Sequence, residues 1–441
     1  MRRDISDAPG PTTTGGCTPV PRSARLQRSH ESQRLWWCAA LLLVSVVARL
    51  LWAFLTPNGL NLVDLHVYVE GAASLLQGDL YDFTYSRDTP DFPLPFTYPP
   101  FAALVFFPLH YLPFGFVGLV WQLLTVAALF GIVRIALELL VGADARNTRW
   151  TAVALVWTAI GVWTEPVRMT LDYGQVNVFL VLGIMIAARS SRWWISGGLV
   201  GLLAGIKLTP AIAGLYLLAR RRWSAAVFSA VVFFGTVAVS VLVLGEQGRK
   251  YFTTFFGDAD RVGPVGSVWN QSLRGALSRI VGHDVGTGAL WLIAVAVSAA
   301  LAYAAWRALG PDDRLGTLVV VELFGLLVSP ISWAHHWVWV VPMLVWLVYG
   351  PLAGRRGTRV IAACWAVTTL VGVPWLLGWA QDSIWDISRP AVLSWLGAAN
   401  VIGALAVYVW IVHAGRTQPP TDPVIARPGS RSGGREPDPT P

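Results

Sequence analysis

The sequence predicts an all-α membrane protein that crosses the bilayer many times. Of its 441 residues, 55% are hydrophobic and only 13% are charged, whereas soluble domains carry about 25% charged residues. Apolar runs of a length that can cross the hydrocarbon core recur between residues 35 and 412. The strands of a membrane β-barrel would instead alternate apolar and polar residues over shorter segments. These observations together favour a bundle of membrane helices.

Composition divides the chain into three parts. Residues 1–34 and 413–441 are rich in proline, glycine, serine and arginine, so we expect two disordered cytoplasmic tails. Residues 35–412 form the predicted transmembrane domain. Its first apolar run, 35–55, has no small-residue cleavage site behind it, so we expect a retained helix. The arginines before this run place the N-terminus in the cytoplasm, because basic residues favour that side.

The same arginine rule assigns a direction to each later apolar run and yields about twelve spans with both termini cytoplasmic. The predicted spans are 35–55, 114–141, 150–163, 175–188, 195–206, 210–219, 223–244, 288–309, 315–328, 337–349, 360–377 and 391–412. Segment 98–112 is apolar but short and bracketed by prolines, so we expect it to be re-entrant or interfacial. The runs 195–206 and 210–219 are shorter than the bilayer, which predicts helices broken between them.

This topology places two long loops, 56–100 and 245–286, on the outer side. Residues 61–100 contain six acidic residues and a single basic one, Arg87, a composition that a simple connector does not need. We interpret this segment as a catalytic loop. Asp64 follows two apolar residues and should lie near the membrane surface, where a carboxylate can act as a general base. A solvated acid at the start of a helix is the alternative interpretation of Asp64.

Lys207 is one of only two lysines in the chain, and it lies in the sequence GIKLTP between two apolar half-helices. An unpaired cation deep in a membrane costs about 2.5–3.5 kcal/mol on insertion scales. A bound phosphate group would compensate the charge, and snorkelling to the headgroups is the alternative. His335 and His336 lie at a predicted outer helix junction. Neighbours on a helix point about 100° apart, so we expect only one of them to face a ligand.

Other polar residues collect at the predicted outer mouth of the bundle. The segments DYGQVN (172–177) and WNQSLRG (269–275) combine amides, aromatic rings and a basic residue, which suits sugar hydroxyls and ring faces. Hydrogen bonds that only hold the loops together explain each single residue equally well. If the site transfers a sugar from a phosphate-linked donor to an acceptor, the candidates for binding the donor phosphate are Lys207, Arg274 and Arg168. The candidates for binding the sugar or the acceptor are Tyr98, Gln175, Asn177, Asn270, Gln271 and Glu165.

Several other kinds of site are disfavoured by the sequence. No metal-ligand spacing occurs, so we expect no metal. No basic stripe with interleaved aromatic residues occurs, which argues against nucleic-acid binding.

Glu322 lies in the middle of a predicted span and needs a partner that the sequence does not identify. A site on the outer side has no access to cytoplasmic nucleotide sugars, so a sugar transfer there would use a lipid-linked donor.

Five motifs carry a resemblance to a known family: VDLHVYVEGAASLL, TYPPFAALVFFPL, DYGQVNVFL, GLLAGIKLTPAI and SPISWAHHWVW. They resemble the polyprenyl-phosphate-mannose-dependent α-(1→2)-mannosyltransferases of mycobacteria and their relatives, glycosyltransferase family 87 of the GT-C superfamily. The resemblance covers residues 35–412. It implies a multi-pass plasma-membrane enzyme with a GT-C fold, a catalytic first extracytoplasmic loop and an active site facing the periplasmic side.

The resemblance also implies a reaction. Mannose would pass from polyprenyl phosphate mannose to phosphatidylinositol tetramannoside, with inversion and without cofactor, metal or nucleotide. Asp64 matches the loop aspartate expected to be the base. The histidine pair matches a position tied to the donor phosphate, with His336 favoured over His335. The expected partners are the donor, the phosphatidylinositol mannoside acceptor and membrane lipids, and no obligatory protein partner is evident.

Two alternatives remain at this level. A sister enzyme that adds α-(1→2) branches to lipomannan or lipoarabinomannan would share the motifs around the site and differ in its acceptor groove. A lipid or sugar transporter would show internal repeats with charges near the midplane in both halves. No repeat is evident in the sequence, and the polar residues gather on one predicted side.

Overall fold

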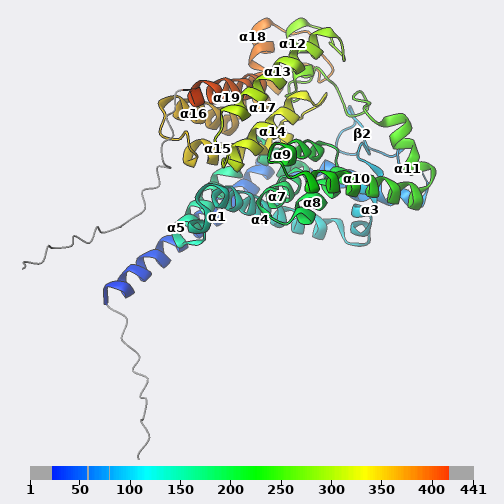
Figure 1. Ribbon diagram of the computed structural model, residues 1–441. Helices are drawn as coiled ribbons and strands as arrows, with labels where there is room; N and C mark the ends of the chain where they lie inside the picture. Colours follow the sequence, from blue (N-terminus) through cyan, green and yellow to red (C-terminus); the bar gives the residue numbers. More distant parts are fainter. Residues whose placement is uncertain (1–21, 57–58, 79, 417–441) are drawn as a thin grey trace, which may run out of the picture.

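The computed structural model describes residues 22–56, 59–78 and 80–416, and these fold almost entirely into helices (Figure 1). The helices of the first half are α1 (Arg22–Leu55), α2 (Val63–Ala73), α3 (Pro100–Phe106), α4 (Phe114–Val141), α5 (Thr148–Gly161), α6 (Glu165–Tyr173), α7 (Asn177–Arg189), α8 (Trp193–Ile206) and α9 (Ala213–Ala219). The predicted tail segments 1–21 and 417–441 lie outside the described residues.

The second half continues the helical bundle. Its helices are α10 (Trp223–Leu244), α11 (Glu246–Lys250), α12 (Leu273–Val281), α13 (Ala289–Ala308), α14 (Arg314–Val328), α15 (Val340–Tyr349), α16 (Arg356–Val371), α17 (Val373–Gly378), α18 (Ala391–Leu396) and α19 (Ala399–Arg416). Shorter turns are η1 (Ser74–Leu76), η2 (Phe107–Tyr111), η3 (Gly142–Arg146), η4 (Thr209–Ile212), the π-helical η5 (Tyr251–Phe255) and η6 (Ala334–Trp339). The main core lies between α4, α7, α14, α15 and α19.

The first helix begins earlier than the sequence predicts. α1 starts at Arg22, so residues 22–34, predicted as part of a disordered tail, are helical. The segment contains alanine, leucine, arginine, glutamine and glutamate but no proline or glycine, and these residues sustain a helix beyond its apolar part. At the other end α19 runs to Arg416, a few residues past the predicted boundary.

Among the described residues, five helices are long and apolar enough to cross a membrane: His30–Leu55, Phe114–Arg146, Trp223–Leu244, Ala289–Ala308 and Ala399–Arg416. Five shorter apolar helical segments accompany them: Pro100–Tyr111, Asn177–Arg189, Trp193–Ile206, Thr209–Ala219 and Ala334–Tyr349. The predicted class, an all-α membrane protein, agrees with this inventory. The number of twelve spans and the direction of each stay predictions.

The helix break predicted at GIKLTP is present. α8 ends at Ile206, and Lys207 takes an extended backbone conformation with φ −147° and ψ 134°. Pro210, in the first turn of η4, has no N–H with which to continue the hydrogen bonding of α8, so the helix is interrupted here. The break leaves the Lys207 side chain at a junction between two helical segments.

Two predicted continuous spans are wrong in detail. Segment 360–377 is divided at Gly372, whose φ of 76° ends α16, and Pro374 then starts α17. A left-handed backbone conformation is readily available to glycine and stops a right-handed helix. Segment 391–412 is likewise divided between α18 and α19. Hydropathy alone does not register either break, because the residues on both sides stay apolar.

Segment 98–112, predicted to be re-entrant or interfacial, forms the short helical pieces α3 and η2. These pieces pack against α2, α8 and α10. Their combined length is too short for an ordinary span. The segment therefore has the expected form, and its place relative to the membrane stays a prediction.

The two predicted outer loops join into one structure. In the first, β1 (Thr84–Tyr85) and β2 (Leu94–Pro95) form a small antiparallel ribbon, which Figure 1 shows on the same side of the molecule as α11. The Lys250 ammonium group lies 2.9 Å from a carboxylate oxygen of Asp82, and the backbone N–H of Leu80 donates to Gln247 at 2.9 Å. These contacts hold the first loop against the start of the second.

Candidate functional site

A cavity of about 760 Å³ opens where the two outer loops meet the helix junctions. Its wall combines α2, the segment before α3, the turn between α6 and α7, the break after α8, and η6. Segments from distant parts of the sequence therefore meet at one place. Six of the sequence-predicted site residues line it: Asp64, Tyr98, Gln175, Lys207, His335 and His336.

Asp64 lies in the first turn of α2, and the chain enters this helix through Leu62, whose backbone is left-handed at φ 49°. The Leu62 N–H donates to the Asp172 carbonyl oxygen at 2.9 Å, which fixes the helix start against α6. Burial raises the pKa of Asp64 to about 6, while a hydrogen bond from Gln175 and the charge of Lys207 act to lower it. A carboxylate with this pKa can accept a proton near neutral pH.

A hydrogen-bond network orients the side-chain amide of Gln175, which donates to Asp64. Tyr68 lies one turn after Asp64 on α2, and its hydroxyl lies 2.9 Å from the Tyr98 hydroxyl and 2.9 Å from Gln175 Oε1. Because the Gln175 oxygen accepts from Tyr68, its amide N–H groups remain available to donate to the Asp64 carboxylate. The network therefore fixes the orientation of the amide and keeps a donor on the carboxylate.

Lys207 is the buried cation of the cavity. Its Nζ donates to Asn177 Oδ1 at 2.9 Å, lies 3.2 Å from His336 Nε2, and sits 5.2 Å from the centre of the Tyr98 ring. An ammonium group carries three N–H donors. Two of them are engaged by Asn177 and His336, which leaves the third for an anion in the cavity.

Both histidines line the cavity, and the expectation that only one of them faces a ligand stays a prediction. They lie on η6, a 3₁₀ segment that is kinked at Trp337. Their ring centres are 4.8 Å apart and their planes meet at 79°, so each ring presents a different edge to a wide cavity. The ring nitrogens of His335 are buried and have no hydrogen-bond partner within the described part of the chain.

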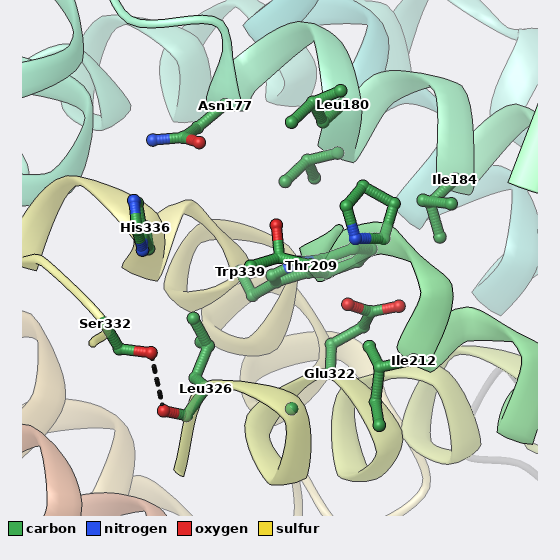
Figure 2. A pocket seen from close by; sticks show the side chains of 13 residues that line it. Asn177, Leu180, Ile184, Thr209, Ile212, Glu322, Leu326, Ser332, His336 and Trp339 are labelled. Carbon is green, nitrogen blue, oxygen red and sulfur yellow. Dashed lines mark hydrogen bonds between the residues drawn. The ribbon is translucent and has the colours of Figure 1, made fainter. Parts of the chain in front are cut away.

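Asn177 does not line the large cavity. Its Oδ1 accepts from Lys207, and its Nδ2 donates to the His335 carbonyl oxygen at 3.0 Å. The amide thus holds the lysine and the η6 backbone together, a different role from the predicted sugar contact. Asn177 lines a second, much smaller cavity, whose side chains are shown in Figure 2.

Three predicted site residues of the second outer loop lie outside the large cavity. The Asn270 side chain bonds to the carbonyl oxygens of Val265 and Pro330 and to the N–H of Ser332, and Gln271 donates to the Gly397 carbonyl oxygen. The structure thus uses both amides to hold loops together. Arg274 forms a two-point ion pair with Asp284, with Nε 3.0 Å from Oδ1 and a terminal nitrogen 2.5 Å from Oδ2.

Glu165 and Arg168 also lie outside the large cavity, on α6. The Glu165 carboxylate accepts from the Trp375 N–H at 2.7 Å, at the start of α17. The Arg168 guanidinium lies 4.7 Å from the centre of the Trp375 ring. Both side chains pack α6 against α17, and this placement does not bring Arg168 to the cavity that Lys207 lines.

Several residues that line the cavity, or that hold its side chains in place as Tyr68 does, were missed from the sequence. Tyr68 could have been found, because it follows Asp64 by four residues and shares its helix face. Arg261 lines the cavity and stacks 4.2 Å from the centre of the Phe255 ring, and its guanidinium bonds to the Tyr81 carbonyl oxygen. The outer part of the lining adds acids and aromatic rings: Asp88, Asp91, Asp258, Phe92, Trp269 and Trp333. These come from loops whose meeting no local pattern reveals.

No group of three or more His, Cys, Asp or Glu side chains in the described ranges is arranged to hold a metal ion. His66, close to Asp64 in sequence, is instead bonded to Glu70 at 2.7 Å and stacked on the Phe114 ring.

Comparisons with known proteins point to one family. The profile of glycosyltransferase family 87 matches residues 96–330. The chain is 56% identical over 90% of its length to the polyprenol-phosphate-mannose-dependent alpha-(1-2)-phosphatidylinositol pentamannoside mannosyltransferase of Mycolicibacterium smegmatis, covering 94% of that protein. It is 55% identical, over 90% of its length and 92% of the relative, to the protein of the same name from Mycobacterium tuberculosis.

A more distant relative of Mycobacterium tuberculosis is 33% identical over 88% of this chain and 92% of its own length. It is the polyprenol-phosphate-mannose-dependent alpha-(1-2)-phosphatidylinositol mannoside mannosyltransferase. No solved structure matches the chain.

Proposed function

The chain belongs to glycosyltransferase family 87, and on this basis we propose that it transfers mannose from polyprenyl phosphate mannose to a phosphatidylinositol mannoside through an α-(1→2) linkage. The names of two relatives above half identity state this donor and this linkage. The observation that carries the proposal is the shared cavity of Asp64 and Lys207. Asp64 is suited to activate an acceptor hydroxyl, and Lys207 is suited to bind the phosphate of the donor.

The reaction follows from these two groups. Asp64 accepts the proton of the acceptor hydroxyl, and the hydroxyl oxygen of the acceptor attacks C1 of the donor mannose. The bond from C1 to the phosphate oxygen breaks, and polyprenyl phosphate leaves with the electron pair. Lys207, which is held by Asn177 and His336, compensates the charge that develops on the phosphate. A single displacement of this kind inverts the configuration at C1, so a β-linked donor gives an α-linked product.

The acceptor we propose is phosphatidylinositol tetramannoside, with the pentamannoside as product. The cavity extends from Asp64 to a region of aromatic rings and carboxylates, among them Phe92, Trp333 and Asp258. Aromatic faces and hydrogen-bond acceptors suit the several mannose units of such a headgroup. A sister activity that branches lipomannan would use the same reaction centre and is kept as the second candidate.

The proposed location is the plasma membrane, with the cavity on the extracytoplasmic side and both termini cytoplasmic. Support comes from the arginine distribution in the sequence and from the lipid nature of both substrates. A lipid donor and a lipid acceptor can both enter from the bilayer, which explains why the candidate site lies at helix junctions beside the outer loops.

The decisive experiment supplies purified protein in lipid with polyprenyl phosphate mannose and, in separate reactions, phosphatidylinositol tetramannoside or lipomannan. We expect one added mannose on the tetramannoside, cleavable by an α-(1→2)-specific mannosidase. Transfer to lipomannan alone would replace the first acceptor with the second. Absence of transfer to either acceptor, with folded protein and intact donor, would refute the proposed activity.

A further inference from the structure

A small cavity of about 40 Å³ adjoins the large one, and Figure 2 shows the side chains that line it. Its polar lining consists of Asn177, Thr209, Glu322, Ser332 and His336, and the rest is apolar. Only Thr209 and His336 line both cavities, so their side chains form the wall between them. A water molecule needs about 10–15 Å³ of such space together with polar partners. The small cavity therefore has room for about three water molecules.

Glu322 is the residue of this cavity that the reaction leaves unexplained. It lies in the middle of α14, is 4% exposed, and its Oε1 has no hydrogen-bond partner within the described ranges. A buried carboxyl group without a partner costs free energy that an apolar side chain of similar size would not cost. Either a water molecule forms a hydrogen bond with the Glu322 carboxyl group, or the protein bears the free-energy cost of a buried oxygen without a hydrogen bond.

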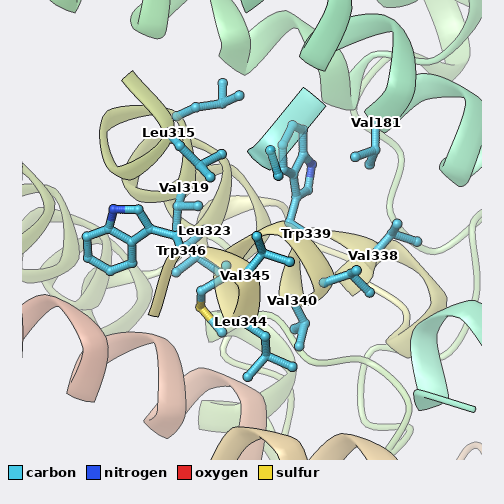
Figure 3. Packing of buried hydrophobic residues seen from close by; sticks show 14 of the residues in the cluster. Val181, Leu315, Val319, Leu323, Val338, Trp339, Val340, Leu344, Val345 and Trp346 are labelled. Atoms are coloured by element: carbon cyan, nitrogen blue, oxygen red, sulfur yellow. The ribbon is translucent and has the colours of Figure 1, made fainter. Parts of the chain in front are cut away.

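The packing around α14 gives Glu322 a fixed position. Leu315, Val319 and Leu323 of α14 pack with Val340 and Leu344 of α15 in one buried cluster (Figure 3). The residues of this cluster are close to fully buried, and η6 with His336 continues directly into α15. The carboxyl group and the imidazole are thus carried by two helical segments that are packed together.

The contact with Lys207 indicates which nitrogen of His336 carries the proton in this structure. The ammonium group has no acceptor, so the 3.2 Å contact between Lys207 Nζ and His336 Nε2 requires that Nε2 accept. In the neutral imidazole the proton then lies on Nδ1. Nδ1 is buried and also has no partner among the described residues. Two unsatisfied polar groups, a donor and an acceptor, therefore belong to residues that line the same cavity.

We propose that ordered water in the small cavity links His336 Nδ1–H to the Glu322 carboxyl group, making Glu322 a positioning residue for the donor site. Glu322 touches neither substrate. Its hydrogen bonds hold His336 in the tautomer whose Nε2 accepts from Lys207, which keeps the lysine N–H groups aimed at Asn177, His336 and the large cavity. The expected effect on donor binding rests on the proposed function. The expected tautomer of His336 is independent of that function.

The direct test measures the tautomer by NMR on protein in lipid, with ¹⁵N-histidine incorporated and His336 assigned by its loss in His336→Asn. We expect wild-type His336 to be protonated on Nδ1 and to lose much of that population in Glu322→Leu. A wild-type ring protonated on Nε2, or identical His336 resonances in the two proteins, would overturn the proposal. This measurement needs no substrate, so its outcome is independent of the proposed activity.

The second test separates positioning from stability by kinetics. Glu322→Leu should raise the KM for polyprenyl phosphate mannose about tenfold, the effect of one lost hydrogen bond to a charged group, and leave the acceptor KM unchanged. Glu322→Gln retains an acceptor oxygen and should restore most of the donor affinity. Thr317→Val is the matched control, because Thr317 is buried on the same helix and its hydroxyl bonds to the carbonyl oxygen of Asp313, the residue that caps this helix.

Thermal unfolding completes the comparison. Glu322→Leu should melt below the wild-type temperature, because it leaves the His336 Nδ1–H without its water link, and Glu322→Gln should recover most of that loss. A purely structural role also predicts a lower melting temperature, but with the apparent kcat lowered in step with the folded fraction and both KM values unchanged. That result would overturn the proposal, whereas an inactive wild type with the expected tautomer would refute the proposed function and leave the water link intact.

Discussion

The hydroxyl groups of Tyr68 and Tyr98 lie 2.9 Å apart and join α2 to the segment that leads into α3. Tyr68 also donates to Gln175, which bonds to Asp64. The carboxylate proposed as the base is therefore oriented by side chains from three separate parts of the chain. The predictions below follow from this network and from its neighbour Lys207.

Replacing Tyr68 with phenylalanine should lower kcat about tenfold without unfolding the protein. The substitution removes the hydroxyl that fixes the Gln175 amide, and one buried hydrogen bond is worth on the order of 1 kcal/mol. Tyr408→Phe is the control, because its hydroxyl bonds to the Val320 carbonyl oxygen and Tyr408 lines neither cavity. Equal losses of activity in both variants would mean that the hydroxyl of Tyr68 has no special role.

Asp64→Asn should lower kcat by about 10³-fold, within the range that general-base catalysis contributes. The amide keeps the size of the carboxylate and can still bond to Gln175, but it cannot accept the proton of the acceptor hydroxyl. The donor KM should stay near the wild-type value. Transfer at the normal rate in the variant would eliminate Asp64 as the base.

The pH dependence of kcat/KM should show an acid limb with a midpoint near pH 6. Burial raises the pKa of Asp64 to about 6, and the base works only when deprotonated, so activity falls as the pH drops through this value. The charge of Lys207 and the Gln175 hydrogen bond lower the pKa. Lys207→Met and Gln175→Leu should therefore both move the acid limb to higher pH, and an unmoved limb would assign it to another group.

Arg274 and Lys207 should behave differently toward the donor, although the sequence proposed both for its phosphate. Arg274 is committed to Asp284 outside the cavity, so Arg274→Gln should change the donor KM less than about twofold and cost at most about 1 kcal/mol of stability. Lys207→Gln should raise the donor KM more than about tenfold, because a buried charge that binds an anion is lost. The assay measures initial rates against donor concentration.

The predicted topology is tested by cysteine labelling in intact cells, with the native cysteines Cys17, Cys38 and Cys364 replaced. Asp88 and Arg356 are both exposed in the structure, so neither position is shielded by the fold. A reagent that cannot cross the membrane should label cysteine at position 88 and not at position 356. The reverse pattern would place the candidate site in the cytoplasm.

The end of the helix at Lys207 could be predicted from the sequence, because a lone lysine and a proline interrupt a run of apolar residues there. Asp64 could be singled out for the same reason, as an acid at the edge of an apolar segment. The division of the predicted spans at Gly372 and before α19 was not predicted. Glycine and small residues leave the hydropathy of a run unchanged, so a left-handed residue inside it is invisible to that measure.

Residue type alone proposed Asn270, Gln271 and Arg274 as ligand-binding groups, and the fold uses their polar atoms internally. The Asn270 and Gln271 amides donate to the distant carbonyl oxygens of Pro330 and Gly397, and Arg274 pairs with the nearby carboxylate of Asp284. Buried or partly buried polar groups must be paired, and the sequence does not reveal whether the partner is protein or ligand. That distinction depends on distances between segments that lie far apart in the chain.

The sequence by itself determined the membrane class, the family, the helix break at Lys207 and the candidate base Asp64, since each is a property of a short run of residues. Only the tertiary structure decided that both histidines line the cavity and that Asn177 holds Lys207. It also identified Tyr68, and it placed Glu322 and His336 on a shared small cavity. The physical reason is that hydropathy and helix periodicity act locally, whereas a site requires side chains from several helices to converge, and their packing sets that geometry.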